Sequence, residues 1–425
     1  MRATDGSGFS AAIVDLVLYV VANQQRLAAA GSSIVLYLPK IQTAAEAALW
    51  NDILDGLESH LGLQRGTIKV YVLIEQLEAA FQLMEIRAAL GAHFVGFNTG
   101  RWDYINSVSD ALAGDPGFVN PNIDVITMTY PYMRAYEDRV RRAVNTPDRN
   151  GRFALWQGGM EPNIPVGSAD GVRRAMERAV AGARREQQAG ASGKWVAHWK
   201  MVHIVRPVWE EIGETNQSGR PMPPLTYTAA DAQALVSTEK AARSIRGSRD
   251  LISVAMQYAN AFGQGLQAAA LKPADTFGDD DVLYLMEDMA TAEIRVSILW
   301  EWLHKQARLA ETDGSEEPAM LLSLELFEQL LAEEYQKLLA ASSRDVHDDS
   351  KPTTLPVARL LVHAFVTSPS KLPWFVDLLN ATLSVHDLRE AQARIASLRD
   401  AFLSRGVRIT ANLDFERGVS SARAD

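Results

Sequence analysis

The chain has 425 residues, of which 47% are hydrophobic and 22% charged, the composition of an ordinary globular protein. Its formal charge of −10 and isoelectric point near 5.4 exclude the basic surface needed to neutralise phosphates, so we expect no nucleic-acid partner. The chain contains no cysteine, which excludes disulfides, thiolate metal sites and cysteine nucleophiles.

The most apolar stretch near the start is AAIVDLVLYVVA, residues 11–22. It contains Asp15 and falls well short of the roughly 20 residues that cross a bilayer, so we predict a buried helix and no membrane partner. No secretion signal precedes it, and the terminal SARAD is not a peroxisomal Ser-Lys-Leu address. We therefore expect a cytoplasmic or peroxisomal (glyoxysomal) protein with no recognisable targeting signal.

Short apolar runs alternate with amphipathic segments through the first half of the chain. Near-continuous apolarity in the runs is typical of parallel strands covered on both faces, and the alternation indicates βα units. This pattern predicts a (β/α) barrel or a doubly wound sheet. The expected strands are SSIVLYLP (32–39), TIKVYVLI (67–74), HFVGF (93–97), IDVITMT (123–129), RFALWQ (152–157) and KWVAHW (194–199).

After the Pro-rich stretch RPMPPL (220–225) the pattern becomes helical. Apolar residues then recur with a period near 3.6, as between Leu251 and Phe262. We predict three parts: a barrel region over residues 1–225, a helical domain over 226–383 and an extra helical tail over 384–425.

Two carboxylates follow successive predicted strands. Glu75 comes directly after TIKVYVLI, and Asp103 follows HFVGFNTGRW. In a barrel both would lie at the carboxyl face, where chemistry gathers. Two such carboxylates suit one Mg²⁺, although acids at strand ends also often cap helices, and the residues alone leave both interpretations open.

Asp288 lies beside Glu287, immediately before a strongly helical run. One interpretation is that these acids complement the positive end of a helix dipole. The other is a general base whose pKa is raised by its acidic neighbour. His198 and His203 do not fit a zinc pattern, and we interpret them as structural.

Six ordered segments resemble motifs of the malate synthase family, in its shorter A-type form. GRWDY and MEDMATAEI are the most specific matches, and the resemblance spans about residues 10–335. The segments are VLIEQLEAAFQLMEIRAAL (72–90), FNTGRWDYINS (97–107), MTYPYMRAY (128–136), QGGMEPNIP (157–165), GKWVAHW (193–199) and LMEDMATAEIRVSILWEWLH (285–304).

This resemblance implies a TIM (β/α)8-type barrel, incomplete at the N-terminus, with a C-terminal helical plug. It implies condensation of acetyl-CoA with glyoxylate to malate and CoA, the reaction of the glyoxylate cycle, with Mg²⁺ as cofactor. It maps Glu75 and Asp103 onto the metal ligands and Asp288 onto the base that removes a methyl proton of acetyl-CoA. It maps the backbone around Gly100, Trp102 and Asp103 onto the cradle for the glyoxylate carboxylate. It says nothing of the oligomeric state.

The chain also departs from the family pattern. The chain begins near the family's first helix, and the Arg-Gly-Trp-His run of the first barrel strand, whose arginine stabilises the enolate, is absent. Loss of one such group costs about 10² to 10³ in rate, so we expect activity at least about a hundredfold below that of a full-length relative, unless Arg101 or Arg134 takes the role.

Two alternatives remain open from the residues. One is a catalytically impaired paralogue that acts as a binding protein, which an arginine in the site would argue against. The other is a related CoA-ester lyase or synthase of the citrate-lyase β type. Turnover of malyl-CoA against citramalyl-CoA would separate that enzyme from a malate synthase.

Overall fold

The computed structural model of the chain describes residues 9–213, 215–279, 281–311, 320–341, 354–372 and scattered positions between 374 and 400. The predicted tail after residue 384 therefore lies almost wholly outside the described residues. Within the described part, every helix is too short or too polar to cross a bilayer.

Five parallel strands form the main sheet, and they pair in the order in which they occur in the chain. Sequential order is that of a barrel, whereas a doubly wound sheet would reverse direction at a switch point. The barrel alternative is therefore the one that the structure takes. The strands are β1 (Ile34–Leu38), β2 (Ile68–Ile74), β3 (Phe94–Thr99), β4 (Leu155–Glu161) and β5 (Gly193–Val196).

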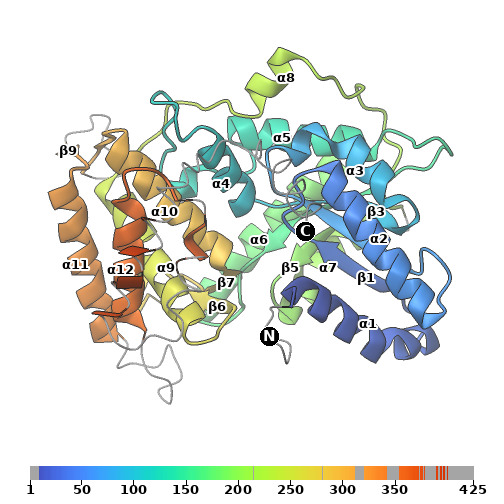
Figure 1. Cartoon of the computed structure of the whole chain (residues 1–425), viewed down its shortest axis with the longest axis horizontal. Helices are drawn as coiled ribbons and strands as arrows, with labels where there is room; N and C mark the ends of the chain where they lie inside the picture. Colours follow the sequence, from blue (N-terminus) through green and yellow to red (C-terminus); the bar gives the residue numbers. More distant parts are fainter. Residues whose placement is uncertain are drawn as a thin grey trace, which may run out of the picture.

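The sheet curls strongly across its width. Tyr37 on β1 stacks on Trp195 of β5 with ring centroids 5.0 Å apart, and it also stacks on Tyr71 of β2 at 5.6 Å. The first and last strands of the sheet therefore approach each other through side chains, although they share no hydrogen-bonded ladder. The result is an open half-barrel, drawn in blue and green in Figure 1.

One predicted strand is wrong. Residues 123–129 form a single 3-10 turn (Ile123–Val125) followed by loop. β3 pairs directly with β4, so no place in the sheet is open for this segment. The residue just before it is tied to the loop before α9, because the amide of Asn122 donates to the carbonyl of Ala242 at 2.9 Å, and the carbonyl of Ile126 accepts from Nε of Arg101 at 3.1 Å.

Helices follow the strands and cover the outside of the half-barrel (Figure 1). Local signals set their ends. The helix after β1 starts with a capping box between Thr43 and Glu46 and ends at Gly62, which has a left-handed φ of 66°. The helices are α1 (Ala11–Ala29), α2 (Ala44–Leu61), α3 (Leu83–Leu90), α4 (Trp102–Ala111), α5 (Pro131–Val144), α6 (Ala169–Ala189), α7 (Val202–Glu210) and α8 (Ala229–Ala234).

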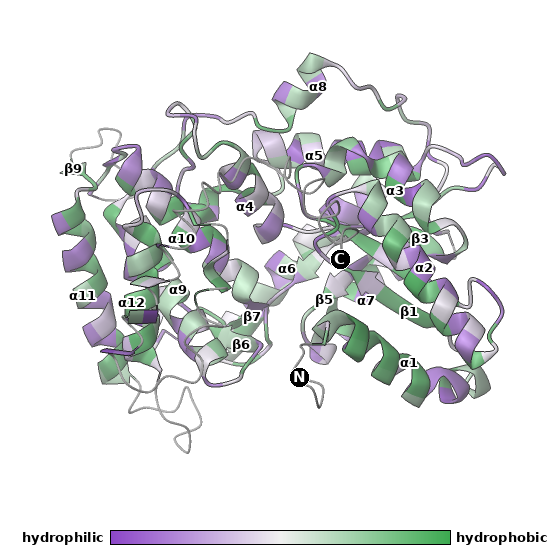
Figure 2. Cartoon of the chain, in the orientation of Figure 1, coloured by the Kyte–Doolittle hydropathy of each residue, from purple (hydrophilic) through white to green (hydrophobic). Residues whose placement is uncertain are grey.

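Helix α1 forms where the apolar stretch predicted it, but the prediction that it is buried is wrong. Only Leu16 and Val20 are buried on α1, whereas Leu18 and Val21 are 61% and 52% exposed. The apolar outer face of α1 is visible as a green ribbon in Figure 2. A single apolar stripe facing β1 is enough to hold the helix, so its remaining apolar residues stay on the outside.

The second half of the chain is helical, as expected, and carries two short hairpins in addition. The helices are α9 (Ile245–Gly263), α10 (Met289–His304), α11 (Leu324–Ala341) and α12 (Leu355–Val366). The hairpins pair β6 (Ala268–Leu271) with β7 (Leu285–Asp288), and β8 (Arg308–Leu309) with β9 (Met320–Leu321). Short 3-10 turns occupy Ala79–Phe81, Gly91–His93, Trp199–Met201 and Ala274–Thr276.

The helical region is fastened to the half-barrel by buried polar contacts. Ser297 on α10 donates to the side chain of Asn106 on α4 at 2.5 Å. The fully buried carboxylate of Glu301 accepts hydrogen bonds from Ser109 and from the backbone and side chain of Asn120. Because unpaired buried polar groups are costly, these contacts fix how α10 lies on α4.

A second fastening leads directly to the end of β4. The amide of Met286 on β7 donates to the carbonyl of Pro162 at 2.9 Å, and the amide of Ile164 donates to the carbonyl of Tyr284 at 3.2 Å. The loop after β4 thus holds β7 beside the carboxyl end of the sheet. Asp288, the last residue of β7, is placed there although it is distant in sequence from the strands.

Candidate active site

Glu75 lies at the carboxyl end of the sheet, directly after β2, and is 4% exposed. The chain leaves room for it by using glycine at position 100. A Cβ on Gly100 would meet the Cβ of Glu75 at 2.8 Å and its Oε2 at 2.9 Å. The absence of a side chain at Gly100 is therefore what allows the carboxylate to stand at this end of the sheet.

Asp103 lies beside Glu75, in the first turn of α4. The two carboxylates are close enough to share a hydrogen bond when one is protonated. One residue at the end of β1 contacts both of them. The backbone amide of Lys40 donates to Oε1 of Glu75 at 2.7 Å, and its Nζ donates to Oδ1 of Asp103 at 2.5 Å.

Lys40 is the residue of this site that the sequence patterns did not reveal. It adopts a left-handed backbone conformation with a φ of 56°, which is unfavourable for a lysine. The hydrogen bond from its backbone amide to the carboxylate of Glu75 stabilises this conformation. Burial of its stem lowers the pKa of Lys40, but the charges of Asp103 and Glu75 outweigh that effect and raise it. Lys40 thus stays an ammonium ion, with 48% of its side chain exposed.

The electrostatics of the two carboxylates suit a divalent cation. Burial first, and the neighbouring Asp103 second, raise the pKa of Glu75 well above its usual range. One lysine shared between two adjacent carboxylates does not relieve their repulsion, whereas a hard cation bound by oxygen ligands would. The residues present therefore fit Mg²⁺, which Glu75 and Asp103 would hold.

Asp288 reaches this group of charges from the helical region. Burial first, and the charge of Asp103 second, raise the pKa of Asp288, and Lys40 opposes that rise. Asp288 also caps α10, because its Oδ1 accepts a hydrogen bond from the amide of Ala290 at 3.0 Å. Both interpretations of its sequence position therefore apply: it caps a helix, and it lies within electrostatic reach of the other acids. We call Lys40, Glu75, Asp103 and Asp288 the carboxyl-end cluster.

Trp102 faces away from this cluster. Its Nε1 donates to Oε1 of Glu287 at 2.8 Å, and the guanidinium groups of Arg101 and Arg295 lie against its ring. Any contact of Trp102 with a substrate at the cluster is therefore through its backbone rather than its ring. The cradle predicted around Gly100, Trp102 and Asp103 stays a prediction.

Another acidic group with metal-ligand residues lies at the opposite end of the strands. Asp55, Glu58 and His93 place one ligand atom each within 4.8 Å of one another. Each of their carboxylate oxygens already accepts a hydrogen bond from the protein. Arg65 donates two hydrogen bonds to Asp55, at 2.7 and 2.8 Å. Glu58 accepts hydrogen bonds from the backbone amides of Gly66, just before β2, and Ile68, the first residue of β2. We therefore interpret this amino-end cluster as structural.

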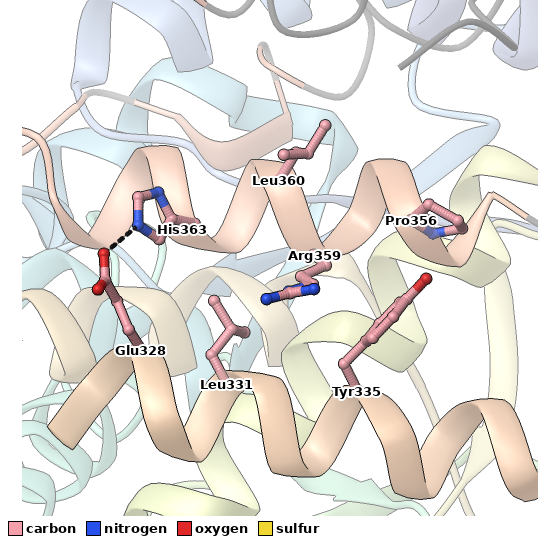
Figure 3. Close-up of a pocket in the computed structure, with 7 residues that line it drawn as sticks. All are labelled: Glu328, Leu331, Tyr335, Pro356, Arg359, Leu360 and His363. Carbon is pink, nitrogen blue, oxygen red and sulfur yellow. Dashed lines mark hydrogen bonds and ion pairs between the residues drawn. The ribbon is translucent and has the colours of Figure 1, made fainter. Parts of the chain in front are cut away.

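His198 and His203 take no part in either cluster. His198 accepts a hydrogen bond from the amide of Lys200 at 3.2 Å and stacks on Trp199. His203 is exposed on α7. A cavity of about 490 Å³ lies between α11 and α12, where His363 contacts Glu328 and Arg359 lies over Tyr335 (Figure 3). It is lined only by the helical region and contains no group of the carboxyl-end cluster.

Comparisons with known proteins agree with the resemblance seen in the motifs. The family model described as "Malate synthase, TIM barrel domain" matches residues 2–230, and the model described as "Malate synthase, C-terminal" matches residues 245–360. The chain is 33% identical to the malate synthase of Myxococcus xanthus over 91% of its own length and 66% of that protein. It is 33% identical to malate synthase A of Escherichia coli over 79% of its length and 58% of that protein.

The chain thus spans about three fifths to two thirds of these relatives. Among solved structures, the pyruvate and acetyl-CoA complex of Haloferax volcanii malate synthase is similar with a TM-score of 0.41 and 14% identity, covering 68% of this chain and 66% of that one.

Proposed function

The chain belongs to the malate synthase family, and we propose from this premise that it condenses acetyl-CoA with glyoxylate to give malate and CoA. The observation that carries the proposal is the approach of Asp288, from the helical region, to Asp103 and Lys40, which lie beside Glu75 at the end of the sheet. This arrangement puts a base beside a metal-ligand pair. The family's chemistry requires both.

Asp288 is the base of the proposed reaction. Its free carboxylate oxygen takes a proton from the methyl group of acetyl-CoA, and the electrons of that C–H bond form the enolate of the thioester. The methyl carbon of the enolate then bonds to the aldehyde carbon of glyoxylate, and the resulting alkoxide oxygen takes up a proton to become the hydroxyl of the product. Water then adds to the thioester carbonyl and the C–S bond breaks. CoA leaves as the thiol, and Asp288 returns its proton to solvent. The raised pKa of Asp288 makes it a stronger base than an ordinary aspartate, which suits removal of a proton from a weak carbon acid.

Lys40 supplies positive charge close to that base. The enolate oxygen carries negative charge as the proton leaves, and a preorganised cation nearby lowers the energy of that state. Because Asp103 and Glu75 raise the pKa of Lys40, it remains protonated at neutral pH and acts as a charge and donor rather than as a base. Of the described residues, Lys40 makes the ion pair with Asp103, so we assign it this role ahead of Arg101 or Arg134.

Mg²⁺ held by Glu75 and Asp103 would polarise the aldehyde of glyoxylate. The N-terminus of α4, next to Asp103, offers backbone amides for the carboxylate of the same substrate.

The direct test is release of CoA from acetyl-CoA and glyoxylate by the purified chain in the presence of Mg²⁺. We expect turnover that depends on glyoxylate and is abolished by a chelator. Malate must form in amounts equal to the CoA released.

Two outcomes would redirect the assignment. Cleavage of citramalyl-CoA without synthesis of malate would favour a lyase of the citrate-lyase β type. Binding of Mg²⁺ and glyoxylate with no CoA release would favour a binding protein that has kept the metal site.

A further inference from the structure

A cavity of about 590 Å³ lies between the half-barrel and the helical region, behind Trp102. We call it the Trp102 cavity. Its walls come from the N-terminal ends of α4 and α10, from α9, from the β6–β7 hairpin and from Arg178 on α6. None of the residues of the carboxyl-end cluster lines it.

The floor of the cavity carries two arginines packed on one aromatic ring. The guanidinium carbon of Arg101 lies 4.1 Å from the ring centroid of Trp102, and that of Arg295 lies 5.5 Å from it. Two cations thus repel each other at the base of a concave site, which a bound anion would relieve.

These two arginines are only partly paired. Among the described residues Arg101 makes one hydrogen bond, from Nε to the carbonyl of Ile126, and no ion pair. Arg295 is 6% exposed; its Nη1 donates to the carbonyl of Thr291 at 3.1 Å, but its Nε makes no hydrogen bond. Its nearest carboxylate oxygen, Oδ2 of Asp250, lies 3.6 Å away, beyond hydrogen-bond distance, and is itself unsatisfied. Buried charges without full pairing are expensive, so their presence here points to a ligand.

Further cations line the mouth of the cavity. Arg178 and Arg246 are exposed there. Lys272 also lines the cavity, but its Nζ is held by the carbonyls of Asp279 and Val282. Without it, Arg101, Arg295, Arg178 and Arg246 make four cationic side chains, against three carboxylates. One of these carboxylates, Glu287, is already held by Nε1 of Trp102 at 2.8 Å and by the hydroxyl of Thr291 at 2.9 Å.

The remaining wall is apolar. Val254 and Tyr258 on α9 and Leu271 and Leu285 on the hairpin contribute to it, together with the ring of Trp102. A pocket with an apolar wall and a few convergent charges suits a ligand that has both an apolar body and a charged group. Bare inorganic anions would leave the apolar wall without a partner.

We propose that the Trp102 cavity is a second ligand site, which binds a small organic anion whose carboxylate or phosphate lies on Arg101 and Arg295 and whose apolar body lies against α9 and the β6–β7 hairpin. The inference does not depend on the proposed activity, because it rests on residues outside the carboxyl-end cluster.

Occupancy of this site is coupled to the carboxyl-end cluster through two short links. Arg101 and Trp102 immediately precede Asp103, and Glu287 immediately precedes Asp288. The hydrogen bond from Nε1 of Trp102 to Glu287 connects these two chain segments. A ligand that draws Arg101 and Arg295 toward itself therefore changes the field at Asp103 and Asp288. Ligand binding and substrate binding must then affect each other reciprocally.

The test is calorimetric titration of the whole chain with matched probes. Phenyl phosphate and benzoate carry both an apolar body and a charge. Inorganic phosphate and acetate carry the charge alone, and benzyl alcohol carries the apolar body alone. We expect at least one of the first pair to bind about tenfold more tightly than all the single-feature probes, because both parts of the cavity contribute only in that case. Comparison of benzoate with phenyl phosphate also shows whether the cavity prefers a carboxylate or a phosphate.

Variants at the mouth locate the binding. Arg178→Gln combined with Arg246→Gln should weaken binding about tenfold in total, because the loss of two positive charges at the mouth reduces the attraction of the cavity for an anion. Arg173→Gln is the matched control: Arg173 is 58% exposed on the same helix as Arg178 but does not line the cavity. It should leave the affinity unchanged. Both variants alter exposed residues, so the fold is retained.

Three results would overturn the proposal. One is binding that the double variant leaves unchanged. Another is complete loss of binding in Glu75→Gln, which would place the probe at the carboxyl-end cluster instead. The last is equal affinity for phenyl phosphate and inorganic phosphate, which would indicate a nonspecific anion site. Titration in the presence of saturating glyoxylate completes the test, because simple competition would also assign the probe to the substrate site.

Discussion

The two acidic clusters of the half-barrel lie at opposite ends of the same strands and differ in how their charges are balanced. In the amino-end cluster Asp55 is hydrogen-bonded to Arg65 and to His93, and Glu58 accepts hydrogen bonds from two backbone amides. In the carboxyl-end cluster Glu75 and Asp103 share one lysine, and Asp288 adds a further negative charge nearby.

This difference appears as opposite shifts of pKa. The hydrogen bond from Arg65 is the largest of the causes that lower the pKa of Asp55, to about 2. Burial and a like charge instead raise the pKa of Glu75. The amino-end cluster resembles a metal site by residue type and distance, but its oxygens are already occupied by protein donors. Unbalanced charge, rather than a high density of acids, therefore distinguishes the candidate active site.

The largest expected effect is on the base. Asp288→Asn should lower kcat by up to about 10⁴-fold, because the amide cannot accept the methyl proton. Asparagine still caps a helix, so α10 should remain intact. The measurement is CoA release, paired with a titration of glyoxylate in the presence of Mg²⁺, which should be unaffected. Asp281→Asn, at an exposed position outside the cluster, serves as the control. Loss of glyoxylate binding in Asp288→Asn would contradict the assignment.

The next effect concerns the cation of the carboxyl-end cluster. Lys40→Met should lower kcat by about 10² to 10³, the scale for loss of one preorganised stabilising group. Lys40→Arg should recover part of the rate, which a purely structural role would not predict. Lys69→Met is a matched control, because Lys69 lies on β2 and its Nζ contacts the carbonyl of Ala92 near the other end of the sheet. An unchanged kcat in Lys40→Met would show that another cation stabilises the enolate.

The pH profile tests the raised pKa of Asp288. Only the ionised carboxylate accepts a proton, so kcat/KM should fall about tenfold for each pH unit below its pKa. Because burial and Asp103 raise this pKa, the fall should begin above the value near 3.9 of an ordinary aspartate. Steady-state rates across the acidic range measure this. A profile that stays flat down to pH 4 would show that Asp288 is not the titrating base.

Removing a carboxylate should change the free energy of unfolding in opposite directions in the two clusters, and the larger change should be in the amino-end cluster. Asp55→Asn should lower the free energy of unfolding by about 1 to 3 kcal/mol, because it weakens a charge-assisted network and leaves the buried His93 with a poorer partner. The folded-state pKa of Asp55 is lowered, so its contribution is present above the unfolded value and is lost as the pH falls toward about 2. Denaturation at pH 7 and pH 2 should show the difference only at pH 7.

Glu75→Gln should have the smallest effect, and of the opposite sign. The folded-state pKa of Glu75 is raised, so stability is fully present below the unfolded value and is lost as the pH rises through the folded one. A glutamine, which cannot ionise, should therefore raise the melting temperature at neutral pH without Mg²⁺ and leave it unchanged in acid. Added Mg²⁺ should stabilise the parent chain but not the variant. Equal stabilisation of both would contradict Glu75 as a ligand.

Several features were predictable from sequence because their causes are local. Five of the six apolar runs became strands in chain order, and Glu75 and Asp103 follow two of them. Residues 123–129 were predicted wrongly because a short apolar run looks the same whether it pairs in a sheet or packs as a loop. Ala242, the backbone partner of the preceding Asn122, lies more than a hundred residues away, beyond the reach of any local pattern.

The sequence by itself determined that strands in chain order precede a helical region, and its motifs identified the family, since periodicity and motif order are properties of the chain. It also predicted Glu75, Asp103 and Asp288 as site residues. Only the tertiary structure decided that Lys40 joins Glu75 to Asp103, that the amino-end cluster is satisfied, and that Arg101 and Arg295 meet on one side of Trp102. The reason is that a charge acts through its distance and burial relative to other charges, and both are set by residues far apart in sequence.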